Sequence, residues 1–118
     1  MEASQFGSVI IAVLNRSMVE DHFSGFVPGP VSVGAITHSG SVYHIILTGD
    51  ESIGLNFEDS TYSVRRAETT VNGELLDSDY AGFCRETGTF LVLKLQPDGR
   101  FLMERRSSSL SEILLLEK

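Results

Sequence analysis

Histidine and cysteine, the residue types that most often bind metals or act as nucleophiles, are few in this chain and far apart along it. The sequence holds three histidines, His22, His38 and His44, and one cysteine, Cys84. A structural zinc site takes four such ligands, often in closely spaced pairs. A site in this chain would have to use all of these side chains, and none of them has a second one beside it at ligand spacing. The sequence therefore predicts no metal site and no cofactor.

Cys84 is the thiol that a catalytic mechanism would use as a nucleophile. Arg85 follows it, and a neighbouring cation favours the reactive thiolate, which also needs a histidine as base. The sequence positions no histidine for this role. Because free cysteine is among the most buried residue types, we expect Cys84 to be a buried structural thiol. His44 is likewise expected to be a partly buried strand residue on the same face as Val33 and Ile46.

Neighbouring acidic residues, the third group that could do chemistry, occur where turns are expected. These pairs are Asp50 with Glu51 and Glu58 with Asp59. A glycosidase needs two carboxyl groups that face each other across a cleft, whereas acidic residues in turns are ordinary. The sequence also lacks a phosphate-binding glycine loop, a dinucleotide fingerprint and a calcium loop. We therefore predict no catalytic residue and a protein that is not an enzyme.

Length and charge limit the class of protein further. The 118 residues, 42% of them hydrophobic, suffice for one modest core, so we expect a single β-rich domain over residues 1–118. The net charge of −7, from 16 acidic and 9 basic residues, repels the phosphates of nucleic acids and anionic lipids. The apolar run at residues 9–14 is too short for a signal peptide or a membrane span. Together with the single cysteine, these features predict an intracellular protein that binds neither nucleic acid nor membranes directly.

Turn signals that recur every few residues divide the chain into short strands. This spacing predicts a mainly β fold, a small antiparallel barrel or sandwich of hairpins with one or two short helices. One helix is expected from Ser17 to about Phe23, because Ser17 and Glu20 fit a capping box. Residues 109–116 fit a second capping box, and we favour a short helix there, although their aliphatic run suits a strand equally. The expected strands are residues 6–14 (a run that also suits a helix), 31–37, 42–48, 53–58, 61–66, 68–72, 89–95 and 100–106.

The hairpin at residues 90–106 is the best-defined element. Pro97 and Gly99 suit a turn over residues 96–99, which would pair Leu95 with Arg100. Alternation along the two strands then produces two faces that are both largely apolar. One face would carry Leu91, Leu93, Leu95 and Leu102, and the other Phe90, Val92, Phe101 and Met103. A hairpin with one buried face should alternate apolar and polar residues, so two apolar faces require two covers.

One cover is the core of the domain itself, and the second is either another segment of this chain, such as residues 110–116, or a partner protein. The hairpin at residues 31–48 has the same property, with Ile36, Tyr43, Ile45 and Leu47 on one face and Val33, Val42 and Ile46 on the other. Two such hairpins favour a dimer, formed with a partner protein or with a second copy of the chain. The predicted partner-binding residues are Phe90, Val92, Phe101 and Met103, with Glu104 and Arg105 as charged residues at the rim.

Residues 89–110 share a pattern with a known family of proteins. The pattern is an aliphatic strand, a turn with glycine, an aromatic strand that ends in glutamate and a basic residue, and a serine cluster followed by an aliphatic residue. The matching positions are residues 91–95, Asp98, Gly99, Phe101, Met103, Glu104, Arg105, residues 107–109 and Leu110. This stretch resembles the end of the N-terminal domain of the ELL-associated factors, positive co-regulators of RNA polymerase II elongation. The resemblance implies a β-rich nuclear domain that forms a heterodimer with an ELL-type elongation factor. The two subunits would pair as in the large general transcription factor heterodimers, whose subunits form interlocked barrels.

Two other functions stay open from the residues alone. Apolar residues on both faces of a strand can line a cavity, so the chain is alternatively a small β-barrel that binds a hydrophobic ligand. The net charge also suits an acidic inhibitor that mimics nucleic acid, although the acidic residues are spread along the chain. The sequence favours a non-catalytic protein–protein interaction module over both.

Overall fold

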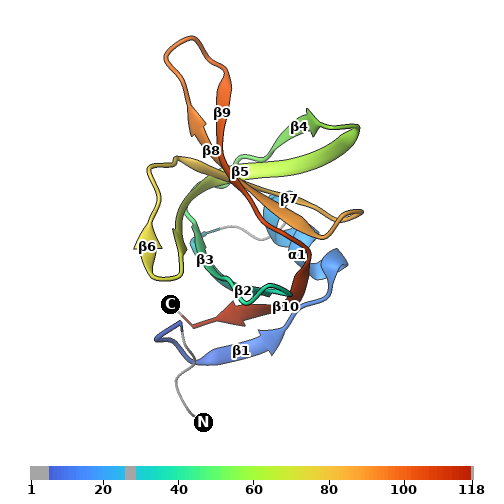
Figure 1. Cartoon of the computed structure of the whole chain (residues 1–118), viewed down its shortest axis with the longest axis vertical. Helices are drawn as coiled ribbons and strands as arrows, with labels where there is room; N and C mark the ends of the chain where they lie inside the picture. Colours follow the sequence, from blue (N-terminus) through green and yellow to red (C-terminus); the bar gives the residue numbers. More distant parts are fainter. Residues whose placement is uncertain (1–5, 26–28, 118) are drawn as a thin grey trace.

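The fold consists of antiparallel strands with a helix packed against them (Figure 1). The computed structural model describes residues 6–25 and 29–117, and within them ten strands form one sheet. The mainly β fold predicted from the spacing of turns is therefore confirmed. Among the described residues, no helix combines the length and apolar character needed to cross a membrane. The elements are β1 (Ile10–Val13), α1 (Arg16–Phe23), β2 (Val31–Thr37), β3 (Val42–Leu47), β4 (Ile53–Phe57), β5 (Ser60–Val71), β6 (Glu74–Leu75), β7 (Tyr80–Cys84), β8 (Thr89–Leu95), β9 (Phe101–Arg106) and β10 (Leu110–Leu116).

The long strand β5 joins two parts of the sheet. Its residues 60–66 pair with β4 and β7, and its residues 67–71 pair with β3 and β6. The main strand order of the described sheet is β1-β10-β2-β3-β5-β7-β8-β9. Because long strands twist, the two parts face different directions. Figure 1 shows the β4–β5 and β8–β9 hairpins at one end of the molecule and β1, β2 and β10 at the other.

Helix α1 covers one face of β7 and β8 and completes the main hydrophobic core. Val19 and Phe23 of the helix are fully buried. The ring of Phe23 lies 6.0 Å from that of Phe83 on β7 and 5.6 Å from that of Phe90 on β8, measured between centroids. The core extends from these rings to Ile45 on β3. One face of the β8 strand is therefore covered from within the chain.

The start of α1 differs from the predicted capping box. Asn15, and not Ser17, caps the helix: its side-chain oxygen accepts a hydrogen bond of 2.9 Å from the amide of Met18. The first helical residue, Arg16, donates to the backbone carbonyl of Glu86 in the turn between β7 and β8 at 2.9 Å. A local cap and a long-range contact together fix where the helix begins.

A second hydrophobic cluster lies on the opposite face of the same strands. Cys84, Leu91 and Leu93 are buried there, with Tyr62 and Val64 from β5. The predicted burial of the Cys84 thiol is therefore confirmed. Gly82 on β7 makes this packing close, because a Cβ atom at this position would lie 2.9 Å from Cγ2 of Val64. The β7–β8 pair is thus apolar on both faces, as predicted for residues 90–95.

Several elements differ from their prediction. Residues 110–116 form β10 between β1 and β2, and the favoured helix there is wrong. Ile113 faces the main core while Leu114 and Leu116 are buried on the other face, and such a strand needs a continuous aliphatic run. The expected strands at 61–66 and 68–72 are the single strand β5, and β7 was not predicted because Gly82 lies in its middle.

The β2–β3 pairing differs by one residue from one that would produce the predicted faces. Val33 pairs with Ile45, and Ile36 pairs with Val42. A shift by one residue moves side chains to the other face of a sheet. Val33 therefore joins Ile45 and Tyr43 in the core, and Ile36 lies on the other face with Val42. The predicted faces of these two β2 residues are wrong, whereas the predicted alternation along β3 is confirmed.

Candidate partner-binding groove

The β8–β9 hairpin closes with the predicted turn, but its pairing differs. Gly99 adopts a φ of +87°, and its amide donates to the carbonyl of Gln96 at 2.9 Å. The carboxylate of Asp98 accepts a hydrogen bond from the amide of Arg100, and the carbonyl of Arg100 accepts one of 2.8 Å from the amide of Gln96. Leu95 therefore pairs with Phe101, and not with Arg100.

A β-bulge in the same hairpin also changes which side chains share a face. The register shifts between Val92 and Leu93, so that Val92 lies opposite Arg105 and Leu93 lies opposite Met103. Glu104 is the extra residue that the shift leaves on β9. The bulge thus places Arg105 on the face of Val92. Phe101 and Met103 lie on the face of Leu93 because Leu95 pairs with Phe101, so their predicted common face with Phe90 and Val92 is wrong.

The predicted partner-binding residues thus divide into two groups. Phe90 and Val92 are fully buried in the main core. Phe101 is half-buried and Met103 has 41% of its surface exposed, on the other face of the sheet. Glu104 and Arg105 are exposed, and the Arg105 guanidinium donates from Nε to the hydroxyl of Tyr43 at 3.1 Å. Because Phe90 and Val92 are buried, they cannot contact a partner, whereas Phe101 and Met103 can.

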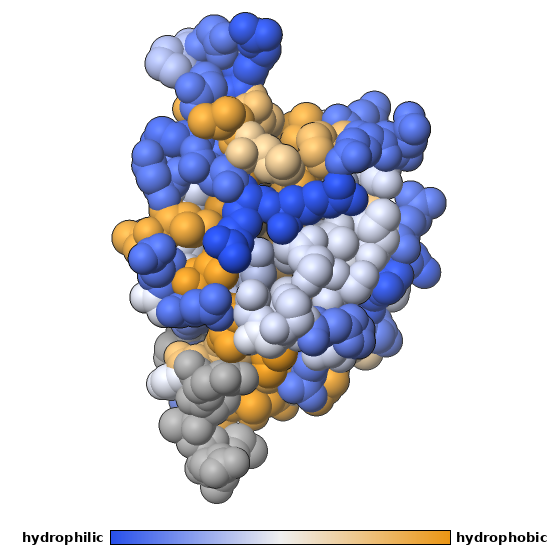
Figure 2. Space-filling model, in the orientation of Figure 1, coloured by the Kyte–Doolittle hydropathy of each residue, from blue (hydrophilic) through white to orange (hydrophobic). Residues whose placement is uncertain are grey.

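Phe101 and Met103 line an open apolar groove of about 370 Å³. Figure 1 shows that the β4–β5 and β8–β9 hairpins diverge, and Figure 2 shows apolar surface below the tip of the β8–β9 hairpin. The sequence did not connect β4 with this site, although its alternating residues 53, 55 and 57 are apolar and signal a buried face. The main apolar residues of the groove are Leu55 and Phe57 on β4, Leu91 and Leu93 on β8, and Phe101 and Met103 on β9.

One end of the groove is closed by contacts between its two walls. Glu58 and Asp59 form the two-residue turn between β4 and β5, both with positive φ, at 49° and 63°. The carboxylate of Glu58 forms an ion pair with Arg106 at the end of β9. The Arg106 guanidinium also lies over the ring of Phe57, 5.6 Å from its centroid. These exposed contacts tether the walls but contribute little free energy.

Aromatic contacts hold Phe101 in place on the opposite wall. The ring of Tyr80 meets that of Phe101 edge-on, with 5.1 Å between centroids. Arg66 lies over the Tyr80 ring at 4.9 Å and donates to its hydroxyl at 2.9 Å. The apolar wall is therefore arranged by the sheet before any partner binds.

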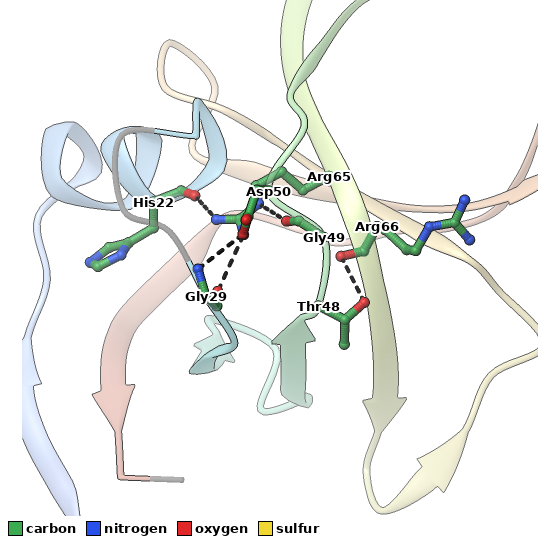
Figure 3. Close-up of polar contacts among 7 residues, drawn as sticks. All are labelled: His22, Gly29, Thr48, Gly49, Asp50, Arg65 and Arg66. Atoms are coloured by element: carbon green, nitrogen blue, oxygen red, sulfur yellow. Dashed lines mark hydrogen bonds and ion pairs between the residues drawn. The ribbon is translucent and has the colours of Figure 1, made fainter.

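Arg65, next to Arg66 on β5, faces α1 and joins the end of that helix to the segment after β3 (Figure 3). Its side chain is fully buried and donates to the backbone carbonyls of His22 at the end of α1 and of Gly49 after β3. Asp50 lies 3.7 Å from its Nη2 atom and accepts a hydrogen bond from the amide of Gly29. Burial lowers the pKa of Arg65, and Asp50 opposes this shift. These donors point at backbone carbonyls, so the arginine has a structural role.

Ser32 and His44 form an arrangement that resembles a nucleophile with its base. The His44 Nε2 atom lies 2.7 Å from the Ser32 hydroxyl on the neighbouring strand. Ser32 is only 5% exposed, and Phe6 packs edge-on against His44 and over Gly34. Burial lowers the pKa of His44. The predicted partial burial of His44 is confirmed, and the Ser32 hydroxyl is its hydrogen-bond partner. His44 shares a face with Ile46 but not with Val33, so the predicted face is wrong for Val33.

Metal-binding groups were also sought among the residues that the structure describes. No cluster of three or more histidine, cysteine or acidic side chains there is placed to hold an ion. The lone Cys84 is buried in the second cluster with no histidine among that cluster's members. The apolar groove is therefore a candidate site in the described part of the chain on the basis of its shape and lining, and not of any metal-binding or nucleophilic group.

Comparison with family models, with curated proteins and with solved structures finds no match for this chain. The resemblance of residues 89–110 to the ELL-associated factors stays a prediction. The residues and their geometry are the basis on which a function is inferred.

Proposed function

We propose that this chain is a non-catalytic protein-interaction module that binds a partner protein in the groove between β4 and β9. The observation that carries the proposal is the difference in cover between the two faces of β8. Helix α1 packs on Phe90, which shares the main core with Val92, whereas in the described residues the cluster around Leu91 and Leu93 is covered only by side chains of the strands themselves. Open apolar surface of this kind marks interaction sites.

The identity of the partner is a further part of the proposal. The resemblance of residues 89–110 favours an ELL-type elongation factor, and with it a nuclear protein in a transcription elongation complex. Phe101, Met103, Glu104 and Arg105 then contribute to binding, whereas Phe90 and Val92 only support the strand from the core side. A second copy of the chain is the competing occupant.

Two neighbouring substitutions on β9 test the site. Met103→Glu places a charge in the groove, and Leu102→Glu places the same charge on the opposite face of the same strand, where Leu102 is 50% exposed. We expect Met103→Glu to weaken binding to an ELL-type factor about tenfold or more and Leu102→Glu to change it about twofold or less. Titration calorimetry with the purified proteins measures both.

The outcomes separate the site from the partner. If the wild-type chain does not bind an ELL-type factor and light scattering shows a dimer that Met103→Glu dissociates, the groove binds a second copy. Equal effects of the two substitutions would contradict the groove as the binding site. Circular dichroism of each variant confirms that a loss of binding is not a loss of folding.

A hydrophobic ligand is the second candidate, because the volume of the groove is within the range of small-molecule sites. Such sites usually also contain a few converging polar groups that orient the ligand. Saturable binding of a fluorescent fatty acid by a monomer, abolished by Met103→Glu, would favour this function over a protein partner.

A further inference from the structure

Both walls of the groove end in a strand that has one unpaired edge. In the described residues β9 pairs with β8, and β4 pairs with β5, and neither has a second neighbour. An unpaired edge presents backbone N–H and C=O groups that another extended chain can bind. The apolar groove is therefore bordered by main-chain donors and acceptors.

The hydrogen bonds of β8 show which residues of β9 face this edge. The Leu93 carbonyl accepts from the amide of Asp79, so the backbone of Leu93 faces β7. Neighbouring residues of a strand point in opposite directions, so Lys94 faces β9 and bonds to Leu102, its partner in the register. The backbone groups of Phe101 and Met103 consequently point away from β8. The same two residues direct their side chains into the groove.

On β4 the two-residue turn determines the direction of the backbone groups. Phe57 and Ser60 flank this turn, and residues in that position hydrogen-bond to each other. The backbone of Leu55 therefore also faces β5, and that of Gly54 and Asn56 faces outward. In each wall, apolar side chains therefore point into the groove, and backbone N–H and C=O groups point to the free edge of the strand.

We propose that the groove binds an extended peptide segment of the partner, which adds to the free edge of β9 as a new strand. This inference rests on the proposed function and specifies the partner. A bound strand satisfies the main-chain groups of Phe101 and Met103 and directs every second side chain, which should be apolar, at Leu91 and Leu93. A helix or a small apolar ligand leaves those main-chain groups without partners.

The charges beside the groove indicate the other residues of that segment. Residues 100–106 hold three arginines and one glutamate, a local charge of +2 in a chain of −7. Arg100 is paired with Asp98 and Arg106 with Glu58, whereas Arg105 is exposed with only a neutral tyrosine hydroxyl as its partner, on the face of β9 opposite the groove. Every second side chain of a bound strand points to that face, so these side chains should be acidic.

The proposed probe is a synthetic peptide in which valine and glutamate alternate over about eight residues. We expect saturable binding to the wild-type chain, and binding about tenfold or more weaker for the peptide with lysine in place of glutamate. The difference should decrease at high salt. Absence of saturable binding, or equal affinity for the two peptides, would overturn the proposal.

A pair of substitutions at Met103 isolates the main-chain contribution. Met103→Ala removes the side chain, and Met103→Pro removes the outward N–H as well, at an edge position where proline is tolerated. We expect Met103→Pro to bind the peptide about tenfold more weakly than Met103→Ala. If Met103→Pro does not fold, the valine–glutamate peptide with methylated amide nitrogens makes the same test on the wild-type chain.

The Met103 variants distinguish a failure of the strand-pairing proposal from a failure of the proposed function. If Met103→Glu abolishes binding of the partner protein while Met103→Pro behaves as Met103→Ala, the groove binds a partner by another mode and the strand is wrong. If Met103→Glu leaves the partner bound, the groove is not the interaction site and both proposals fail.

Discussion

The two faces of β8 have nearly the same composition and different environments. Phe90 and Val92 point to one side, into the main core, where Phe23 of α1 packs on Phe90. Leu91 and Leu93 point to the other side, where only the surrounding strands contribute side chains and the space between β4 and β9 stays open. Apolar residues at every position of a strand show that both faces need a cover, but not which cover comes from the same chain.

The largest expected difference between these faces is in folding stability. Phe90→Ala should lower the free energy of unfolding by about 3–5 kcal/mol, because it leaves a cavity in the main core. Phe101→Ala should cost less than about half of that, because Phe101 is only partly buried and the groove is open to water. Urea unfolding of both variants measures the difference, with an unchanged m-value as the control. Equal losses would mean that the groove face is ordinary core, which would contradict a docking role.

The second comparison uses the neighbouring arginines of β5. Arg65 holds the end of α1, and Arg66 lies over Tyr80 beside the groove. Arg65→Met should lower the unfolding free energy by roughly 1.5–3 kcal/mol, because buried carbonyls lose a charged donor. Arg66→Met should cost about 0.5–1 kcal/mol, the usual value of an exposed cation–π contact.

Hydrogen exchange of the backbone amides distinguishes the two arginines by position. Arg65→Met should speed exchange in α1, which loses its attachment at His22, and Arg66→Met should not. A similar change in α1 for both variants would show that the helix is held by apolar packing alone.

The smallest expected effect is the dependence of stability on pH. Burial lowers the pKa of His22 and of His44 below the ordinary value of 6.5. In the mildly acidic range the unfolded chain therefore binds more protons than the folded chain. The stability that neutral histidines contribute is present above pH 6.5 and is lost as pH falls through their lowered folded values.

Unfolding at about pH 7.5 and about pH 5.5 tests this direction, and the chain should be less stable at the lower pH. His44→Gln keeps a polar partner for Ser32 and should reduce the difference. No histidine lines the groove, so the affinity for the valine–glutamate peptide should change less than stability does. Greater stability at the lower pH would contradict the assigned direction.

Turns were predictable because their determinants are adjacent in the sequence. Pro97 restricts φ and Gly99 takes a positive φ, so the loop after β8 follows from its own residues. The register that follows this loop was not predictable from these two residues, because Arg100 bonds to Gln96 and not to Leu95, which leaves Phe101 as the partner of Leu95. A change of one residue moved Phe101 and Met103 to the other face.

The identity of β10 depended on distant neighbours. Its residues suit a helix or a strand by local preference, and the choice is made by β1 and β2 on either side of it. The helix α1 was recognisable from its capping pattern, but its cap at Asn15 differed from the predicted one by two residues.

The sequence by itself determined that this chain is mainly β, that the strand at residues 90–95 is apolar on both faces and that Cys84 is buried, because composition, alternation and turn residues act locally. Only the tertiary structure decided which face of that strand is covered by the chain itself. That decision depends on contacts between residues far apart in the sequence, such as Phe23 with Phe90 and Arg65 with His22. The open groove is what remains where no such contact covers the sheet.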